Sequence, residues 1–323
     1  MNPTLKKVFI TVLPITLGVF LIWYFLSKLT PQDKNAITNS FRTANYWWVV
    51  LSLILGMLSH LSRAYRWKFL LQPLGYKPKF YNTVLTILMA YLVNLGIPRG
   101  GEVARATAIS KYEGIPFQKA FGTIIAERVA DVIMLSVIIA TAFIMQADLV
   151  KKHVFKNSAS GSIKSIIIVA LLGGLALLAY RYIKKSKHPF LIKLKEFING
   201  IIEGAISIFK MKNKWAFIFH TVFIWVMYVL MFYVVSFALP ETTNLPFGAI
   251  IVGFVVGGVS MALTNGGLGT YPIFVASVLI LYGIADNPAR AFGWIMWSAQ
   301  TLMILLFGGL SFILLPVFNR KKV

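Results

Sequence analysis

Long apolar runs alternate with short polar or basic segments along the whole chain. A helix needs about 20 apolar residues to cross a bilayer, and several of these runs reach that length. The nine runs cover residues 8–26, 47–61, 81–97, 121–145, 163–182, 215–239, 247–263, 268–282 and 289–317. We expect an all-α polytopic membrane protein with about 6–8 transmembrane helices, because one or two of the runs are broken or re-entrant.

The composition excludes an ordinary soluble protein, because 58% of the residues are hydrophobic and only 13% are charged. The formal net charge is +22, but the basic residues gather in segments between apolar runs. This pattern is typical of loops that face an anionic inner leaflet, so we expect no nucleic-acid partner. The chain has no cysteine, which excludes disulfides, thiol catalysis and cysteine metal sites.

Basic segments predict the orientation of the chain in a cytoplasmic (inner) membrane. The segments 63–79 and 181–214 are rich in Lys and Arg, and we place both in the cytoplasm. In this assignment Arg63 and Arg66 belong to a cytoplasmic loop. The segment around Glu241 has no basic residue and belongs outside, while Lys6, Lys7 and residues 320–322 place both termini inside.

The run at 81–97 leads into a stretch rich in glycine, proline and charge, residues 94–105. Proline and glycine break a helix, and a broken backbone at membrane depth needs protein or a wet cavity around it. Because basic segments flank this run on both sides, we expect a broken segment at 81–112 that enters from inside, turns near Asn94 to Gly101 and returns. The alternative is that this run crosses the membrane once, which places one basic loop outside against the positive-inside rule. Lys151, Lys152 and Lys156, which lie on the predicted outer side, favour this alternative.

A weaker counterpart lies in the second half, where residues 263–272 read Leu-Thr-Asn-Gly-Gly-Leu-Gly-Thr-Tyr-Pro between two short apolar runs. Broken segments at corresponding places in two halves are typical of inverted repeats around a central binding site. The other interpretation is a tight turn between two ordinary helices. We therefore expect a second broken segment at 247–284, with both interpretations open.

We expect a single integral-membrane domain over residues 1–323, divided near its middle by an amphipathic segment. Residues 189–210 carry apolar side chains at helical spacing, which predicts a helix lying on the inner leaflet. Packing of this helix against other helices is the alternative. The first half is then 1–188, with the broken segment 81–112, and the second half is 211–323, with the broken segment 247–284.

Six ionisable residues fall within predicted membrane depth. They are Arg99, Glu102, Arg105, Glu127, Arg128 and Asp131. At about 3 kcal/mol each, exposure of all six to lipid would cost roughly 18 kcal/mol, so they must face one another or water. Three acids and three bases can neutralise one another as a structural ion-pair network. They can also form a polar pocket in which arginines grip an anionic headgroup, helped by a half-helix that begins near Gly100.

Three short motifs carry a resemblance that covers nearly all of the chain. They are Asn94, Pro98-Arg99, Gly101-Glu102 and Arg105; Glu127-Arg128 and Asp131; and Gly266-Gly267-Leu268-Gly269. With them the chain resembles the flippase-like family of the lysylphosphatidylglycerol synthase transmembrane region, also described as YbhN-like membrane proteins. The resemblance implies a lipid translocase. Asn265 and Pro272 depart from that family's second motif, in which a proline and a glutamate are usual.

We predict a flippase or transporter that moves a phospholipid or polyprenyl-linked lipid through a polar intramembrane cavity. The candidate substrate-binding residues are Asn94, Pro98, Arg99, Gly101, Glu102, Arg105, Glu127, Arg128, Asp131, Asn265, Gly266, Gly267 and Gly269. We expect no catalytic residue, cofactor or metal, because the four histidines are scattered and the synthase's soluble aminoacyl-transferring domain is not expected here. The alternatives are an integral-membrane enzyme for a lipid-linked substrate and a scaffold for a lipid-synthesis enzyme.

Overall fold

The structure is a computed structural model that describes residues 31–97, 99–146 and 211–320, together with residues 23 and 27. The chain divides into two compact units, Met1–Ile139 with Trp215–Val323 and Ala140–Lys214. Few residues of the second unit are described, so the fold and the site below belong to the first. The segment at 189–210, the apolar run at 163–182 and nearly all of the run at 8–26 lie outside the described residues.

The described residues form α-helices and short 3-10 turns, with no β-strand among them. The α-helices are α2 (Pro31–Thr43), α3 (Tyr46–Leu71), α4 (Phe80–Gly96), α5 (Gly100–Glu113), α6 (Phe117–Met145), α10 (Lys214–Val235), α11 (Phe247–Leu263), α12 (Thr270–Leu281) and α13 (Asp286–Phe318). Within this part of the chain α3, α6, α10 and α13 are long and apolar enough to cross a membrane. The all-α membrane fold is confirmed, and the total number of transmembrane helices stays a prediction.

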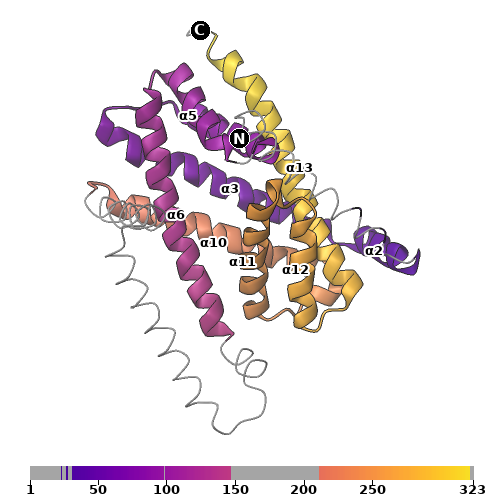
Figure 1. Cartoon of the computed structure of the whole chain (residues 1–323). Helices are drawn as coiled ribbons and strands as arrows, with labels where there is room; N and C mark the ends of the chain where they lie inside the picture. The colour runs from indigo at the N-terminus through magenta and orange to yellow at the C-terminus, as the bar shows by residue number, and fades with distance from the viewer. Residues whose placement is uncertain (1–22, 24–26, 28–30, 98, 147–210, 321–323) are drawn as a thin grey trace, which may run out of the picture. The chain divides into compact units, whose positions relative to one another are not determined.

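The helices follow the same order twice, long, short, short, long (Figure 1). The first set is α3 to α6 and the second is α10 to α13. In each set the two short helices pack against each other: α4 with α5, which we name the first hairpin, and α11 with α12, the second hairpin. The two hairpins cover the segments that the sequence predicts to be broken, at 81–112 and 247–284.

The first hairpin turns where the chain leaves the helical conformation after α4. Ile97 is extended and Arg99 has a φ of 60°, a left-handed conformation that is uncommon for residues other than glycine. The turn is closed by Asn94, whose Oδ1 accepts a hydrogen bond from the backbone N–H of Gly101 at 2.8 Å. A Cβ atom at Gly101 would lie 2.2 Å from the carbonyl oxygen of Ala90, so α5 reaches α4 this closely only with glycine there.

Both ends of the first hairpin lie on the same side. Glu113, the last residue of α5, accepts hydrogen bonds from the backbone N–H of Lys79 at 3.2 Å and from the side-chain amide of Asn82 at the start of α4. The 17 residues of α4 extend only about 25 Å, less than the roughly 30 Å hydrocarbon core. This geometry fits a re-entrant segment better than a full crossing.

The long helix α13 packs against both hairpins. Its start follows directly on the base of the second hairpin, because only residues 282–285 separate Leu281, the end of α12, from Asp286. At its far end, Asn319 exchanges amide hydrogen bonds with Asn82, at the base of the first hairpin. The bases of the two hairpins therefore lie at opposite ends of α13, which is the arrangement of an inverted repeat (Figure 1).

The tips of the two hairpins meet beside the middle of α13. The second hairpin turns through Gly266, Gly267 and Gly269, with φ of 62°, 74° and 73°. Gly266 lies against Leu95 of α4, where an added Cβ would be 2.4 Å from the leucine side chain. The carbonyl oxygen of Gly266 accepts a hydrogen bond from the indole of Trp297 on α13 at 2.9 Å. These contacts bring together two segments that are far apart in the sequence.

Apolar packing is uneven between the two hairpins. The largest buried cluster surrounds the second hairpin and includes Phe232, Phe292, Ile250 and Val275. A smaller cluster beside the first hairpin joins Trp67 at the end of α3 to residues of α5 and α6. Another small cluster packs Leu85 and Met89 of α4 against Leu315 of α13. The second hairpin is therefore held by one large apolar cluster, and the first by smaller apolar clusters together with polar partners.

Candidate functional site

The prediction that Arg63 and Arg66 lie in a cytoplasmic loop is wrong. Helix α3 continues through both residues to Leu71. Their side chains are 3% and 0% exposed. The helix continues because buried carboxylates on α6 neutralise both guanidinium groups, so the two arginines need no water.

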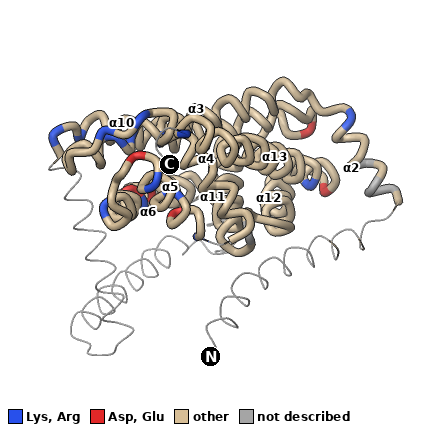
Figure 2. Tube along the Cα trace, turned by 90° about the horizontal axis from the view of Figure 1, so that it is seen from above, with Lys and Arg blue, Asp and Glu red and all other residues tan. Residues whose placement is uncertain are grey.

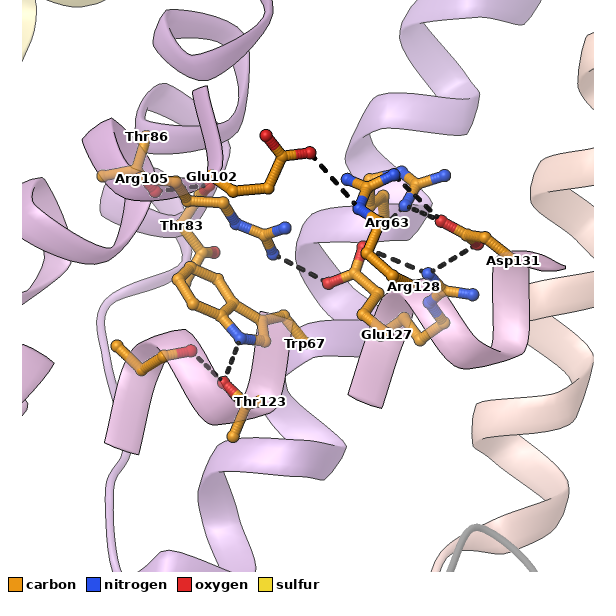
Figure 3. A network of polar contacts seen from close by, with 12 residues as sticks. Arg63, Trp67, Thr83, Thr86, Glu102, Arg105, Thr123, Glu127, Arg128 and Asp131 are labelled. Atoms are coloured by element: carbon orange, nitrogen blue, oxygen red, sulfur yellow. Dashed lines mark hydrogen bonds and ion pairs between the residues drawn. The ribbon is translucent and has the colours of Figure 1, made fainter. Parts of the chain in front are cut away.

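Glu127 on α6 is the centre of the ion-pair network and is 0% exposed. Its Oε1 lies 2.7 Å from Nη1 of Arg63 and 3.1 Å from Nη2 of Arg66. Its other oxygen, Oε2, lies 3.0 Å from Nη2 of Arg105 on α5. One carboxylate thus joins α3, α5 and α6, as Figure 3 shows for Arg105 and Arg63.

Asp131 lies one helical turn further along α6 and shares two of these partners. Its carboxylate lies 2.7 Å from Nη1 of Arg63 and 3.2 Å from Nη2 of Arg66. It also pairs with Arg128 at 3.3 Å, the i,i+3 contact expected from the sequence. Arg66 in turn donates a hydrogen bond to the hydroxyl of Thr221 at 2.9 Å, which connects the network to α10.

The outer edge of the network is looser than its centre. Nε of Arg128 lies 3.5 Å from Oε1 of Glu102 on α5. The two side chains are 43% and 24% exposed, unlike the buried groups around Glu127. A longer, more exposed pair is worth less to stability than a buried one and is easier to open. Arg128 and Glu102 are therefore the members best placed to change partner.

The network carries one positive charge in excess when all its groups are ionised. Its members are Arg63, Arg66, Arg105, Arg128, Glu102, Glu127 and Asp131, which is four bases against three acids. The sequence predicts a neutral set with Arg99 as the third base, but Arg99 is exposed at the hairpin tip and the network includes Arg63 and Arg66 instead. The balance therefore shifts from neutral to cationic.

Arg105 is held in place by an aromatic contact as well as by Glu127. Its guanidinium lies 3.7 Å from the centre of the Trp67 ring, a short cation–π distance. The Trp67 indole N–H donates to the hydroxyl of Thr123 at 2.9 Å, and that hydroxyl donates to the Ala120 carbonyl at 2.7 Å. This chain from α6 through α3 to α5 determines the direction of the Arg105 side chain (Figure 3).

A small hollow opens beside the network, between the first hairpin, α3 and α6. It contains about 250 Å³ of empty space, part of which is open to the surroundings. Its lining consists of Arg63, Ile87, Ala90, Tyr91, Asn94, Gly101, Glu102, Arg105 and Arg128. Its enclosed part has room for about one water molecule, so a larger polar group would bind only if side chains at the open edge moved.

Polar atoms without a hydrogen-bond partner gather in the residues of this lining. They are Nε of Arg63, Arg105 and Arg128 and Oε2 of Glu102. Buried polar atoms in proteins are nearly always paired, so four exceptions around one hollow indicate a polar ligand or ordered water. Most of these atoms are donors, which favours an anionic group.

The predicted site residues fall into separate groups. Asn94, Gly101, Glu102, Arg105 and Arg128 line the hollow. Glu127 and Asp131 lie behind it, where they hold the arginines in place. Arg99 is exposed and is not among the lining residues, and Pro98 and the side chain of Asn265 lie outside the described residues. Gly266, Gly267 and Gly269 form the opposite hairpin tip and are not in the lining.

Sequence reasoning missed Arg63, Arg66, Trp67 and Tyr91. The spacing of Arg63 and Arg66 places them one turn apart at the end of an apolar run, with no acid nearby in the sequence. Glu127 and Asp131 likewise lie about one helical turn apart, at the start of another apolar run. A search for opposite charges one turn apart in two runs could therefore have found this network. Within the described residues, no three His, Asp or Glu side chains lie close enough to hold a metal ion.

Comparison with known proteins identifies the family of the chain. A UPF0104 membrane protein of Methanocaldococcus jannaschii is 29% identical over 223 residues, which covers 58% of this chain and 63% of that protein's length. No solved structure matches the chain. The family described as the lysylphosphatidylglycerol synthase TM region matches residues 11–308. The chain is therefore a multi-pass membrane protein and belongs to the family of the lysylphosphatidylglycerol synthase transmembrane region.

Proposed function

We propose that this protein binds the phosphate of a membrane lipid headgroup in the hollow and moves that headgroup across the membrane. The observation that carries the proposal is the set of three arginines, Arg63, Arg105 and Arg128, that line one hollow. Nε of Arg63 and Nε of Arg105 have no hydrogen-bond partner, and Nε of Arg128 has only the 3.5 Å ion pair with Glu102. In this proposal the protein is a transporter and not an enzyme. The lipid is a phospholipid or a polyprenyl-linked lipid.

The charge balance favours an anionic ligand. The network has one excess positive charge, and a charge left unpaired at membrane depth costs about 3 kcal/mol. A phosphate group would neutralise this excess and accept hydrogen bonds from several guanidinium donors at once. Arg128 is the partly exposed member, so it would meet the ligand first and exchange Glu102 for it.

The surroundings of the hollow favour a lipid over a soluble anion. On α6, next to the network, Ile125 and Val132 lie on the same side of the helix and expose 52% and 41% of their surface. Such an apolar face is suited to lie against acyl chains while the headgroup occupies the polar hollow. The inverted arrangement of the hairpins supports movement between two sides, because it is the architecture in which alternating access recurs.

Basic residues suggest which side faces the cytoplasm. Lys77, Lys79 and Lys111 lie at the base of the first hairpin, whereas the opposite end of the unit carries Glu241 and the Asp286–Arg290 pair. The positive-inside rule then places the base of the first hairpin, and with it the end of α13, on the cytoplasmic side of the inner membrane. Headgroups would enter the hollow from this side.

A transport assay tests the proposal. Headgroup-labelled phospholipids are followed across the bilayer of proteoliposomes that contain the wild type, Arg128→Gln or Arg290→Gln. Because a hydrogen bond to a charged group is worth about 1.5–3 kcal/mol, we expect Arg128→Gln to slow movement about tenfold or more. Arg290 is the matched control, since it pairs with Asp286 at 2.6 Å far from the hollow. If the wild type moves no lipid of a broad panel, or both variants behave alike, the proposal fails.

A further inference from the structure

The tip of the second hairpin contains a cluster of oxygen atoms. The hydroxyl oxygens of Thr264 and Thr270 lie 2.9 Å apart. The Thr264 hydroxyl contacts the carbonyl oxygen of Leu268 at 3.1 Å, and the Thr270 hydroxyl contacts that of Ser260 at 3.0 Å. Ser260, Thr264 and Thr270 are buried and Leu268 is partly buried, so most of this cluster is removed from bulk solvent.

The cluster has three short oxygen–oxygen contacts but only two hydroxyl protons to share among them. A threonine hydroxyl has one proton to donate. The Thr270 proton can serve the Ser260 carbonyl, and the Thr264 proton can serve either the Leu268 carbonyl or the Thr270 hydroxyl. Three contacts therefore share two protons, and one oxygen pair is always without one. Oxygens held this close without a shared proton repel one another, and a cation among them would remove that repulsion.

The end of α11 adds a second, independent reason for a cation. Its last turn contains no basic residue, and Thr264, which ends the helix, is extended with φ −132° and ψ 163°. By contrast, α5 ends at the left-handed Gly114, whose N–H caps the Ser110 carbonyl. The C-terminal end of a helix carries partial negative charge, and unwound half-helix ends of this kind coordinate Na⁺ in membrane transporters.

We propose that the carbonyl oxygens of Ser260 and Leu268 and the hydroxyls of Thr264 and Thr270 bind a monovalent cation of the size of Na⁺. All four ligands are neutral oxygens, and neither α11 nor α12 contains an acidic residue (Figure 2). Divalent cations favour sites with carboxylate ligands, so the donor set selects a singly charged ion. The short oxygen spacing selects a small one.

The bound cation would stabilise the shape of the tip. Leu268 lies within the Gly266 to Gly269 turn, and Gly266 contacts both Leu95 of the first hairpin and Trp297 of α13. Occupancy would thus favour one packing of the two tips. This inference needs no lipid ligand, and it stands or falls separately from the proposed headgroup site.

Cation-dependent thermal stability tests the site. The purified full chain in detergent is heated in NaCl, LiCl, KCl or choline chloride at one ionic strength. For Na⁺ at about five times its Kd, we expect a saturable rise in Tm of about 1–2 °C over choline chloride, with a smaller rise in KCl. Thr264→Val and Thr270→Val, which remove one ligand each, should abolish the rise.

Two controls keep the result interpretable. Thr107→Val removes an exposed threonine hydroxyl on α5, bonded to the Val103 carbonyl at 2.8 Å, and should keep the full response to Na⁺. Thr264→Ser and Thr270→Ser keep the hydroxyl ligands and should retain the response even where the valine variants fold poorly. A wild type that does not distinguish Na⁺ from choline, or valine variants that respond like the wild type, would overturn the site.

Discussion

The first and second hairpins have nearly the same architecture and almost opposite chemistry. Their leading helices, α4 and α11, are both 17 residues long, and both hairpins turn at a glycine-containing break. The first hairpin carries Arg105 and Glu102, which pair with Glu127 and Arg128 of α6 and so join the ion-pair network. The second carries no charged residue at all in α11 or α12 (Figure 2). A repeated fold therefore does not imply a repeated site.

The difference extends to what holds each hairpin in place. The first is anchored by buried ion pairs through Glu127, in which each charge depends on its partners. The second is anchored by close apolar packing, such as Phe232 against Gly253 and against Phe292. Substitutions that remove a charge should therefore destabilise the first hairpin, and substitutions that add side-chain volume should destabilise the second.

The largest expected effect comes from Glu127→Gln. The substitution leaves Arg63, Arg66 and Arg105 with Asp131 as the remaining buried acid, and breaking a buried pair typically costs about 3–5 kcal/mol. We expect a corresponding loss in the free energy of unfolding, measured by thermal or denaturant unfolding in detergent. Glu241→Gln, at an exposed position outside the network, should change it little. Equal losses in the two variants would contradict the central role of Glu127.

A methyl group at the turn of the first hairpin should come next. Gly101→Ala places a Cβ 2.2 Å from the Ala90 carbonyl oxygen, a backbone atom that cannot move aside. We expect a loss of about 3 kcal/mol and a displaced α5, because overpacking of this kind forces backbone shifts. Gly96→Ala on the same turn meets no atom within 4 Å and is the matched control. Unchanged stability and lipid movement in Gly101→Ala would show that the tight contact is unnecessary.

Added volume in the second hairpin should have a smaller effect. Gly253→Ala places a Cβ 2.7 Å from the Phe232 ring, which can shift, so we expect a cost of about 1–2 kcal/mol. Gly258→Ala on the same helix meets no atom within 4 Å and should be neutral or slightly stabilising. Thermal unfolding of the two variants side by side measures the difference. If Gly258→Ala is the more harmful of the two, the packing argument is wrong.

The smallest expected effect is the coupling between Trp67 and Thr123. Trp67→Phe keeps an aromatic face towards Arg105 but leaves a buried cavity and loses the hydrogen bond to Thr123, which is worth about 1 kcal/mol. A double-mutant cycle with Thr123→Val isolates that bond, and the double variant should lose little more than Trp67→Phe alone. Fully additive losses would show that Thr123 does not help to position the Arg105 side chain.

Much of the fold could be predicted because it follows from local physics. Apolar runs gave the long helices, and the glycines and proline at 94–105 predicted the break that the first hairpin shows. The pairing of Arg128 with Asp131 followed from helical spacing. The loop assigned to Arg63 and Arg66 failed for a clear reason. An apolar run ends at the first charged residue, but a helix can continue through charged residues that have buried partners. The partners of Arg63 and Arg66 lie more than 60 positions later in the chain.

The sequence by itself determined that this is an all-α membrane protein with a helix break at 94–105, a glycine-rich interruption at 263–272 and a group of charges that need partners. Length, hydropathy and helix breakers are properties of neighbouring residues, so they can be read along the chain. Only the tertiary structure decided that Glu127 is shared by three arginines, that the network is cationic, and that the hairpin tips meet beside α13. Ion pairs and tip contacts join residues distant in sequence, and their geometry exists only after the helices pack.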